Sequence, residues 1–433
     1  MELTNSIKKN INRSDSQRIS FFEYLYVFVL IIYAGHANTF VEYLVVTENP
    51  VGVFLPIILS GILAIKWNII FDKQFYLLLF CFFIYFIAIS IKYQEFRLNL
   101  LLINFWRFII VYTSVKALKF NLFRIFEYLL YCLAIIGLLM WSVQSILGGN
   151  SLLNYFSNIL SNDSFSFVSG GGLTTIFYSV QPTSSSLLFE NLPPRNCGFA
   201  WEPGGFAVYL SMAIFINLFI TNTDSKGKIR FWVLLLALIS TQSTTGYAIF
   251  TIIMLFYYLN KKMNIVLLIL PIIITASIFI FSLPFMSNKI ISLVNETSAI
   301  DLIVENSIGM ETQETPQRFT SFMIAIRDFI NNPILGTGSF KEESWTYKIG
   351  ANISPISGIG NLLAQHGIIG LLFFIILSIK TSFLFSKYFR FKGDFLMFFI
   401  ILFISISYSI IFFPLVMCFW MFAFFEPLKA SPK

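Results

Sequence analysis

Charged residues are scarce in this sequence of 433 residues: Asp, Glu, Lys and Arg together make up 12% of the chain. A soluble domain carries about 25% charged residues, so half that share is too small to keep a surface of this size in water. The same scarcity excludes an intrinsically disordered chain and a nucleic-acid-binding protein, because both need many exposed charges. Hydrophobic residues instead make up 57% of the chain. This composition indicates a polytopic integral membrane protein.

Histidine and cysteine are also rare, with two and four copies. Cys81, Cys132 and Cys418 lie in apolar runs, and only Cys197 falls in a polar loop. A single loop cysteine cannot form an internal disulfide framework. So few scattered ligands also predict no metal site, and nothing in the sequence requires a cofactor.

Long apolar runs are abundant, and a membrane-spanning helix needs about 20 mostly apolar residues. Twelve segments approach this length and composition: 20–35, 51–67, 75–91, 98–115, 122–147, 204–221, 230–241, 243–259, 265–283, 356–379, 395–411 and 413–426. No small-residue cleavage site follows the first run, so we expect it to stay as an anchor. The predicted fold is therefore an all-α polytopic membrane protein, with about 12 transmembrane helices in one membrane domain, residues 1–433.

The distribution of lysine and arginine predicts the orientation. If the N-terminus lies in the cytoplasm and the chain alternates, most of the 29 Lys and Arg residues fall in inner loops, as the positive-inside rule requires. Both termini are then cytoplasmic, and two large loops, 148–203 and 284–355, face outward. Long loops of this kind usually carry function. The Gly- and Ser-rich stretch 164–186 of the first loop is expected to be flexible.

The second outer loop contains a helical pattern from Arg318 to Asn331. Thr315-Pro316 is a start signal for this helix and Asn332-Pro333 is a stop signal. Its apolar residues recur at helical spacing: Phe319, Phe322, Met323, Ile326 and Ile330. An apolar stripe on a short helix between membrane spans predicts a helix at the outer membrane surface.

The first outer loop ends in Arg195-Asn196-Cys197-Gly198-Phe199-Ala200-Trp201-Glu202-Pro203-Gly204. An arginine can bind a diphosphate through two parallel hydrogen bonds and stays charged where the dielectric constant is low. A carboxylate beside apolar Trp and Phe is a candidate general base. The spacing alone equally allows Arg195 and Glu202 to pair with each other and fix the loop.

Three further charged or glycine-rich features are candidates. Arg318 and Arg327 are nine residues apart, hence near opposite faces of the predicted helix, and the one that faces away is expected to be solvated or paired with Asp328. Gly336-Thr337-Gly338 lacks the features of a phosphate-binding fingerprint and by itself indicates a turn. Arg107 lies inside the fourth predicted span, where a charge is costly, so it should face the interior, contact backbone carbonyls or extend to the interface.

Taken in order, these motifs resemble those of the Wzy-type O-antigen and capsule polymerases and the related O-antigen ligases. One is an R-x-x-G-F-x-x-E-P motif from Arg195 to Pro203. Another is an outer loop with Arg318, a short helix and a partial N-P-x-x-G-x-G-x-x-F motif from Asn332 to Phe340. The third is Gly367-Ile368-Ile369-Gly370 at the entry of the following span. The resemblance covers the number of spans and the lengths and order of the loops, hence most of the chain.

The resemblance implies a membrane glycosyltransferase of GT-C-like architecture in the bacterial cytoplasmic membrane. Its substrate would be an undecaprenyl-diphosphate-linked oligosaccharide, with a flippase and a chain-length regulator as further partners and no metal in the reaction. Two groups of site residues follow: catalytic Arg195, Glu202 and Arg318, and substrate-binding Arg327, Arg107, Gly336 and Gly338.

Two alternatives stay open. The ligases typically carry a histidine at the end of the large loop, where this chain has 355–362 without one, and this favours a polymerase. His366 lies deeper, where a hydrogen-bonded helix histidine is the expected role. A flippase for lipid-linked sugars would also have about twelve spans, but short loops on both sides.

Overall fold

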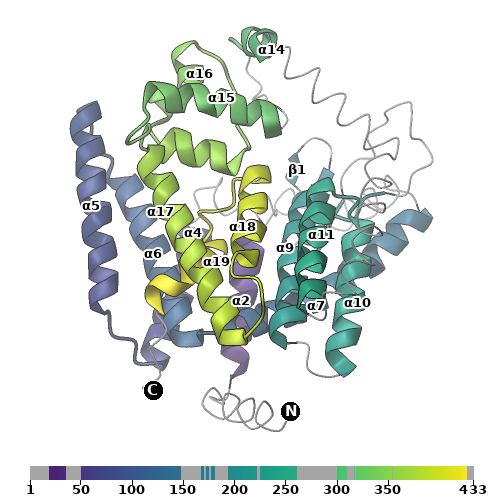
Figure 1. Ribbon diagram of the computed structural model, residues 1–433. Helices are drawn as coiled ribbons and strands as arrows, with labels where there is room; N and C mark the ends of the chain where they lie inside the picture. The colour runs from purple at the N-terminus through teal and green to yellow at the C-terminus, as the bar shows by residue number, and fades with distance from the viewer. Residues whose placement is uncertain are drawn as a thin grey trace.

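The computed structural model describes residues 19–35, 50–147, 167–169, 172–174, 177–180, 194–221, 225–260, 300–309, 316, 318–353 and 355–426. The ninth predicted span, 265–283, lies outside these residues. The described chain is a bundle of helices (Figure 1). Its long and medium helices are α2 (Phe21–Ala34), α4 (Pro50–Lys66), α5 (Lys73–Tyr93), α6 (Leu98–Leu118), α7 (Asn121–Leu147), α9 (Pro203–Ile216), α10 (Ser225–Ser240), α11 (Thr244–Leu259), α15 (Arg318–Asn331), α17 (Gly358–Phe389), α18 (Leu396–Ser407) and α19 (Pro414–Phe425).

Short elements complete this part of the chain. They are the π-helical turn η1 (Asn217–Thr221), α14 (Ile300–Asn306), the 3₁₀ turn η2 (Lys341–Glu343), α16 (Trp345–Lys348) and the strands β1 (Phe167–Ser169), β2 (Gly172–Thr174) and β3 (Ser179–Val180). The strands form an antiparallel sheet in the order β1-β2-β3. This small sheet departs from the all-α prediction and lies inside the stretch 164–186 that was expected to be flexible.

Among the residues that the structure describes, five helices are long and apolar enough to cross a membrane, namely α5, α6, α7, α17 and α9 together with η1. Five shorter apolar helices accompany them: α2, most of α4, α11, α18 and α19. These findings support an all-helical, multi-pass membrane protein. The count of twelve spans and the two large outer loops stay predictions.

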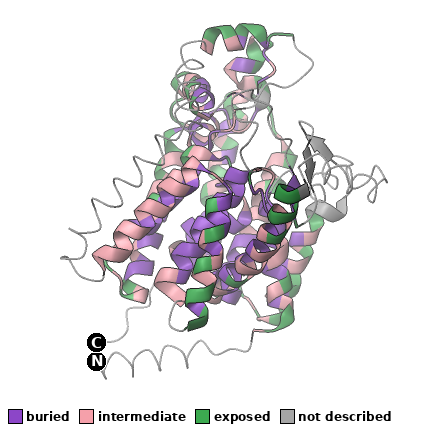
Figure 2. Ribbon diagram, turned by 90° about the vertical axis from the view of Figure 1, so that its right-hand side faces the viewer, coloured by how far each residue is buried: buried purple, intermediate pink, exposed green. Residues whose placement is uncertain are grey.

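Helix α9 lies at the centre of the bundle, and all 14 of its residues are buried. It packs against α7, α10 and α11. Small residues allow this close approach: a Cβ added at Gly246 of α11 would lie 2.7 Å from the Cβ of Ala207 in α9. Figure 2 shows buried residues concentrated inside the bundle and exposed ones on the outer helices. The core therefore fixes the start of α9, where the predicted motif ends.

Helix α5 lies at the edge of the bundle and exposes apolar side chains, among them Phe80 (63% exposed) and Ile91 (72% exposed). In a soluble protein such a face would be costly, but in a bilayer lipid chains surround it at no such cost.

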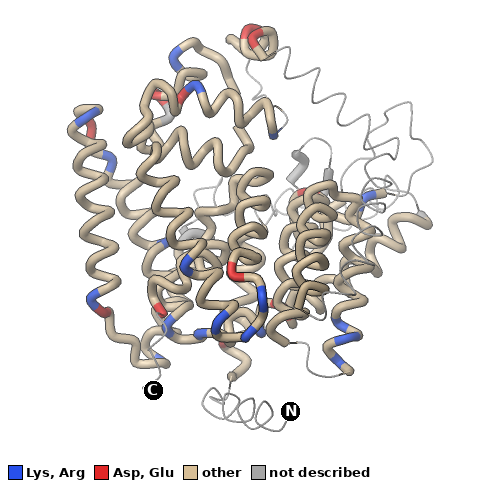
Figure 3. The backbone as a smooth tube through the Cα atoms, viewed as in Figure 1, with Lys and Arg blue, Asp and Glu red and all other residues tan. Residues whose placement is uncertain are grey.

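Charged residues lie mostly toward the two ends of the bundle (Figure 3). At one end, Lys66 pairs with Glu23 at 2.7 Å, and Lys116 pairs with Asp72 at 2.8 Å. The inner segments predicted from the charge bias therefore meet at a common end. Burial raises the pKa of Asp72, but hydrogen bonds from Lys116 and the backbone of Phe75 outweigh this and lower the pKa overall.

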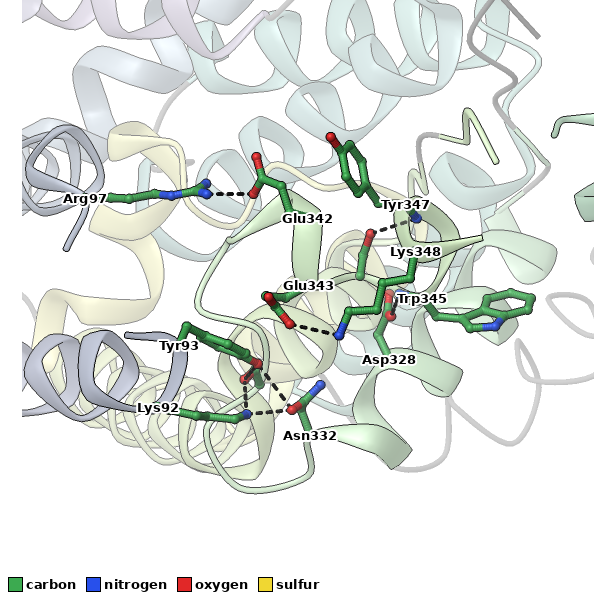
Figure 4. A network of polar contacts seen from close by, with 12 residues as sticks. Lys92, Tyr93, Arg97, Asp328, Asn332, Glu342, Glu343, Trp345, Tyr347 and Lys348 are labelled. Atoms are coloured by element: carbon green, nitrogen blue, oxygen red, sulfur yellow. Dashed lines mark hydrogen bonds and ion pairs between the residues drawn. The ribbon is translucent and has the colours of Figure 1, made fainter. Parts of the chain in front are cut away.

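At the opposite end, α15, η2 and α16 form an outer lobe that is tied to the tip of the α5–α6 hairpin (Figure 4). Lys92 donates to Asn332 at 2.6 Å, and Arg97 pairs with Glu342 at 2.8 Å. The hydroxyl of Tyr93 donates to the carbonyl of Gly336 at 3.2 Å. Lysine and tyrosine at the end of a span are typical of the membrane–water interface. The lobe is thus held where α5 ends.

A kink in α17 anchors the outer lobe to the membrane bundle. Gly367 has φ 60° and ψ −158°, which are not helical and which residues with a side chain rarely adopt. The carbonyls that the kink frees accept hydrogen bonds from the turn after α15: Ala364 from Thr337 at 2.8 Å, and Gln365 from Gly338 at 2.7 Å. The turn and the kink therefore form one unit.

Candidate functional site

Helix α15 carries the first element of the site, and it spans the residues that the sequence pattern predicts, Arg318–Asn331. Its buried residues are Thr320, Ser321, Ile324, Ala325 and Asp328. The predicted apolar stripe instead points largely outward, with Phe319 43% and Ile330 67% exposed. The stripe is thus not what holds α15 to the bundle, and its role at the outer membrane surface stays a prediction.

Arg318, the first residue of α15, pairs with Glu202 at the start of α9. Its Nη2 lies 2.6 Å from Oε1 of Glu202 and donates to the hydroxyl of Tyr408 at 2.5 Å. The guanidinium carbon lies 4.2 Å from the centroid of the Tyr408 ring. We call Arg318, Glu202 and Tyr408 the Arg318 cluster. It joins the two predicted motifs, which are 116 residues apart in the sequence.

The cluster is only partly shielded from solvent, with 25% of the Arg318 side chain and 29% of the Glu202 side chain exposed. Burial lowers the pKa of Arg318, but the hydroxyl of Tyr408 and the carboxylate of Glu202 outweigh this and raise the pKa overall. The guanidinium therefore stays charged. Its Nε is buried and has no hydrogen-bond partner among the described residues.

The motif from Arg195 to Pro203 has a local reason for its shape. Gly198 has φ 51°, and a Cβ there would lie 2.5 Å from the ring of Phe206. Its N–H donates to Oδ1 of Asn196 at 2.9 Å, which closes the turn. Phe199 is fully buried, and Pro203 takes the first position of α9, where no N–H is needed. Glu202 is therefore held as the residue that precedes α9.

Arg195 is held by a different part of the bundle. Its Nε donates to the carbonyl of Thr241 at 3.1 Å and its Nη2 to that of Gln242 at 3.2 Å, at the corner between α10 and α11. The expected alternative of an Arg195–Glu202 pair is wrong, because Glu202 pairs with Arg318. The bend at Gly198 sends the two ends of the motif to different helices. Arg195 still exerts an electrostatic effect on Tyr408, and it is exposed.

Tyr408 is the member of the cluster that the sequence did not indicate. It follows α18 directly, is 3% exposed, and meets the ring of Trp201 edge-on at 5.8 Å between centroids. A tyrosine at the end of an apolar run carries no sequence signal, so only the three-dimensional arrangement could reveal it.

The candidate substrate-binding arginines do not join this cluster. Arg327 was expected to be solvated or paired with Asp328. Its side chain is 40% exposed and pairs with Asp301 at 2.7 Å instead of Asp328, and its guanidinium lies 4.5 Å from the ring centroid of Trp345. Asp328 instead accepts a hydrogen bond from the backbone of Trp345 at 2.5 Å. Arg107 donates to Asn104 one helical turn away at 3.3 Å.

The two candidate glycines have structural reasons for their identity. Gly336 and Gly338 have φ 70° and 65°, which favours glycine. A Cβ at Gly336 would lie 2.4 Å from the backbone of Gln365, and one at Gly338 would lie 2.4 Å from the side chain of Ile89. Their Cα atoms thus face protein, and their contribution to substrate binding stays a proposal.

An apolar cavity of about 160 Å³ lies between α5, α6, α17 and α19. The chain segment between α18 and α19 contributes to both the cluster and the cavity, because Tyr408 belongs to the cluster and Ile411 and Phe412 line the cavity. His366 contributes a polar group, and its Nδ1 is 2.9 Å from the hydroxyl of Tyr85. The histidine is thus hydrogen-bonded, as expected.

Among the residues described above, no group of three or more His, Cys, Asp and Glu side chains is placed to hold a metal ion. The positive charge in the site comes from arginine, and Glu202 supplies the negative charge.

Comparisons with known proteins give one match. Residues 229–375 match the family described as O-antigen ligase. The matched segment contains Arg318, Arg327 and the kink of α17, but not Arg195, Glu202 or Tyr408. No curated protein and no solved structure matches the chain. The family match supports the superfamily of O-antigen ligases and polymerases, a membrane glycosyltransferase-like enzyme and a lipid-linked polysaccharide substrate, without separating polymerase from ligase.

Proposed function

We propose that this protein polymerises undecaprenyl-diphosphate-linked oligosaccharide repeat units into a surface polysaccharide. The reaction would take place at the outer face of the cytoplasmic membrane. The observation that carries the proposal is the Arg318 cluster, in which the 2.6 Å pair of Arg318 and Glu202 unites the two motifs of the resemblance. Its position at the same end of the bundle as the outer lobe supports surface chemistry rather than transport through the bundle.

In the proposed reaction a hydroxyl oxygen of the acceptor sugar attacks the anomeric carbon of the donor sugar. The bond between that carbon and the diphosphate oxygen breaks, and the lipid diphosphate leaves with the bonding electrons. Arg318 and Arg195 would neutralise the charge that develops on the leaving group, and Glu202 would accept the proton of the attacking hydroxyl. Because guanidinium groups supply this charge, we expect the reaction to proceed with EDTA present.

The pair of Arg318 and Glu202 suggests how these roles are linked. A diphosphate carries more charge than one carboxylate and presents oxygens at a spacing that suits bidentate binding to arginine. It would therefore compete with Glu202 for Arg318. The carboxylate released from this pair would become available as the base only when the donor is bound.

The apolar cavity is an argument for a substrate with a lipid chain. Ile411 and Phe412, three and four residues after Tyr408 in the sequence, belong to its lining, and apart from Tyr85, Asn104 and His366 this lining is almost entirely apolar. A diphosphate at the cluster could therefore place isoprene units beside apolar side chains. Arg107 is close enough to His366 to affect it electrostatically, and it would contribute one positive charge to this region.

A ligase that transfers finished polymer from the lipid carrier to an acceptor is the second candidate, because the matched family is described as O-antigen ligase. Both enzymes use the same donor, so the Arg318 cluster suits either. They differ in the acceptor.

Deletion of the gene and analysis of the polysaccharide by gel electrophoresis test the proposal. A polymerase deletion should leave single repeats attached to their final acceptor. A ligase deletion should leave long polymer on the lipid carrier, and would replace the polymerase with the second candidate. Lipid-linked single repeats trapped on the cytoplasmic side would indicate a flippase and contradict both.

A further inference from the structure

Tyr408 occupies the centre of the cluster without belonging to either motif. We infer that Tyr408 is a positioning residue for Arg318, and that it fixes the guanidinium in the orientation that receives the diphosphate. This inference rests on the proposed function. Its first support is that the hydroxyl accepts from Nη2 at 2.5 Å while the ring lies under the guanidinium, 4.2 Å from its carbon. The hydrogen bond restrains the Nη2 end of the guanidinium, and the ring restrains its face.

The backbone of Tyr408 is itself fixed from several sides. Its N–H donates to the carbonyl of Ile404 at 2.8 Å, and a Cβ added at Gly358, the first residue of α17, would lie 2.1 Å from the Tyr408 carbonyl oxygen. The neighbouring Ser409 accepts from the side chain of Asn361 at 3.0 Å. A side chain on so constrained a backbone can hold a flexible partner in place.

Helix α9 leaves room for the hydroxyl of Tyr408. A Cβ added at Gly204, in the first turn of α9, would lie 1.6 Å from this hydroxyl oxygen and 3.3 Å from Nη2 of Arg318. No side chain could stand there without displacing the hydroxyl. The motif that ends in Pro203-Gly204 therefore supplies both the carboxylate that pairs with Arg318 and the space for the tyrosine that positions it.

The bonds to Glu202 and Tyr408 occupy both hydrogens of Nη2, because each nitrogen at the end of a guanidinium carries two. Nε remains buried without a partner among the described residues. When a diphosphate displaces Glu202, the bond to Tyr408 and the contact with its ring would still hold the guanidinium in place. A guanidinium that is already oriented loses less conformational entropy when it binds an anion.

Binding of inorganic pyrophosphate to the purified full-length protein in nanodiscs, measured by isothermal titration calorimetry, tests this inference. Arg318→Ala serves as the reference for loss of the site. Tyr408→Phe keeps the ring under the guanidinium and removes only the hydroxyl, so we expect about tenfold weaker binding with an unchanged melting temperature. Gly204→Ala should weaken binding to a similar extent, because its methyl group displaces the same hydroxyl.

The double variant Gly204→Ala with Tyr408→Phe gives the decisive comparison. If the hydroxyl is what matters, the methyl group adds little once the hydroxyl is absent, and the double variant should bind like Tyr408→Phe alone. Losses that multiply would overturn the inference, since Gly204 would then act through α9 and not through the tyrosine.

Three other outcomes separate this inference from the proposed function. If Tyr408→Phe binds pyrophosphate like wild type while Arg318→Ala does not bind it, the positioning role is overturned and the proposed function is unaffected. Tyr408→Phe that loses binding together with several degrees of melting temperature shows a structural role only. Wild-type protein that binds pyrophosphate no better than Arg318→Ala contradicts the diphosphate site, and with it both proposals.

Discussion

Helix α15 presents two arginines in nearly the same way, one at its first residue and one nine residues later. Arg318 pairs with Glu202 at 2.6 Å and stacks on Tyr408, and Arg327 pairs with Asp301 at 2.7 Å and stacks on Trp345. The contact types are the same, but the surroundings differ. The side chain of Asp301 is 78% exposed, whereas that of Glu202 is 29% exposed.

This difference separates a candidate site from a surface contact. An ion pair near water is screened, and such pairs typically contribute about 0–1 kcal/mol. The two partners of Arg318, Glu202 and Tyr408, come from two distant segments of the chain and leave its Nε without a partner in the described structure. The distances within the two ion pairs do not distinguish the two arginines. The exposure of their carboxylate partners does.

The largest effect should come from Arg318→Ala, which removes the charge from the enclosed end of α15. We expect polymer formation to fall at least about a hundredfold, since loss of one such contact in a transition state costs about 3 kcal/mol. Polymer length and amount in a complemented deletion strain measure this, with the membrane protein level as control. Arg318→Lys should restore little, because lysine lacks the bidentate geometry.

Glu202→Gln should have the next largest effect. The amide keeps an oxygen that can accept from Arg318 but cannot take up a proton, so polymer should drop more than tenfold with little change in melting temperature. A double variant, Arg318→Met with Glu202→Met, should fold at least as well as Arg318→Met alone, because a lone buried charge costs more than none. Polymer made by that double variant would contradict the catalytic roles of both residues.

Arg195→Ala should reduce polymer by about tenfold, less than Arg318→Ala. Arg195 brings a second positive charge, but it is exposed and two of its nitrogens already bind backbone carbonyls. In an in vitro assay, raising the ionic strength should reduce polymer formation by the wild-type protein toward the level of Arg195→Ala. It should change polymer formation by Arg195→Ala little. An equal effect of salt on both would assign Arg195 to fixing the α10–α11 corner.

Arg327→Ala is the matched control for Arg318→Ala on the same helix. Its pair with Asp301 is exposed, so we expect unchanged polymer and a change in unfolding free energy within about 1 kcal/mol. A loss of polymer comparable to that of Arg318→Ala would remove the distinction between the two arginines and support the predicted substrate-binding role of Arg327.

The smallest effect concerns Asp328, next to Arg327. Burial raises the pKa of Asp328 above its usual value of 3.8, although the backbone N–H of Trp345 opposes this. The fold thus favours the protonated form, so this group contributes most stability at low pH and loses it as the pH rises through the raised pKa. Asp328→Asn keeps an acceptor for Trp345. Thermal unfolding should show it slightly more stable than wild type at pH 7, with the difference vanishing near pH 4.

Local signals in the sequence predicted α15 and two members of the cluster. The helix is bounded by prolines and carries helical periodicity, both of which act within a few residues. Arg318 and Glu202 were indicated because charges are rare in this chain and the motif spacing matched a known family. The pairing was not predictable: Arg195 is seven residues from Glu202, yet the positive φ at Gly198 directs them to different supports.

Two features could not be read from the sequence because they depend on contacts between distant segments. Tyr408 follows an apolar run, and its partner lies 90 residues away. Gly336-Thr337-Gly338 is predicted as a turn, and the structure shows that Thr337 and Gly338 of this turn donate backbone hydrogen bonds to the kink of α17 before Gly367. The sequence contains both glycine motifs, and nothing in it says that they meet.

The spread of the Arg318 cluster along the chain has a consequence for biogenesis. The ribosome makes Glu202 first, Arg318 116 residues later and Tyr408 a further 90 residues later. Insertion into the membrane follows the same order. A chain that stalls before α18 has inserted can form the ion pair but lacks the ring and hydroxyl that orient it. If Tyr408 positions Arg318 as proposed, the site is therefore assembled only after α18 has been made, and a chain that stalls earlier should be inactive.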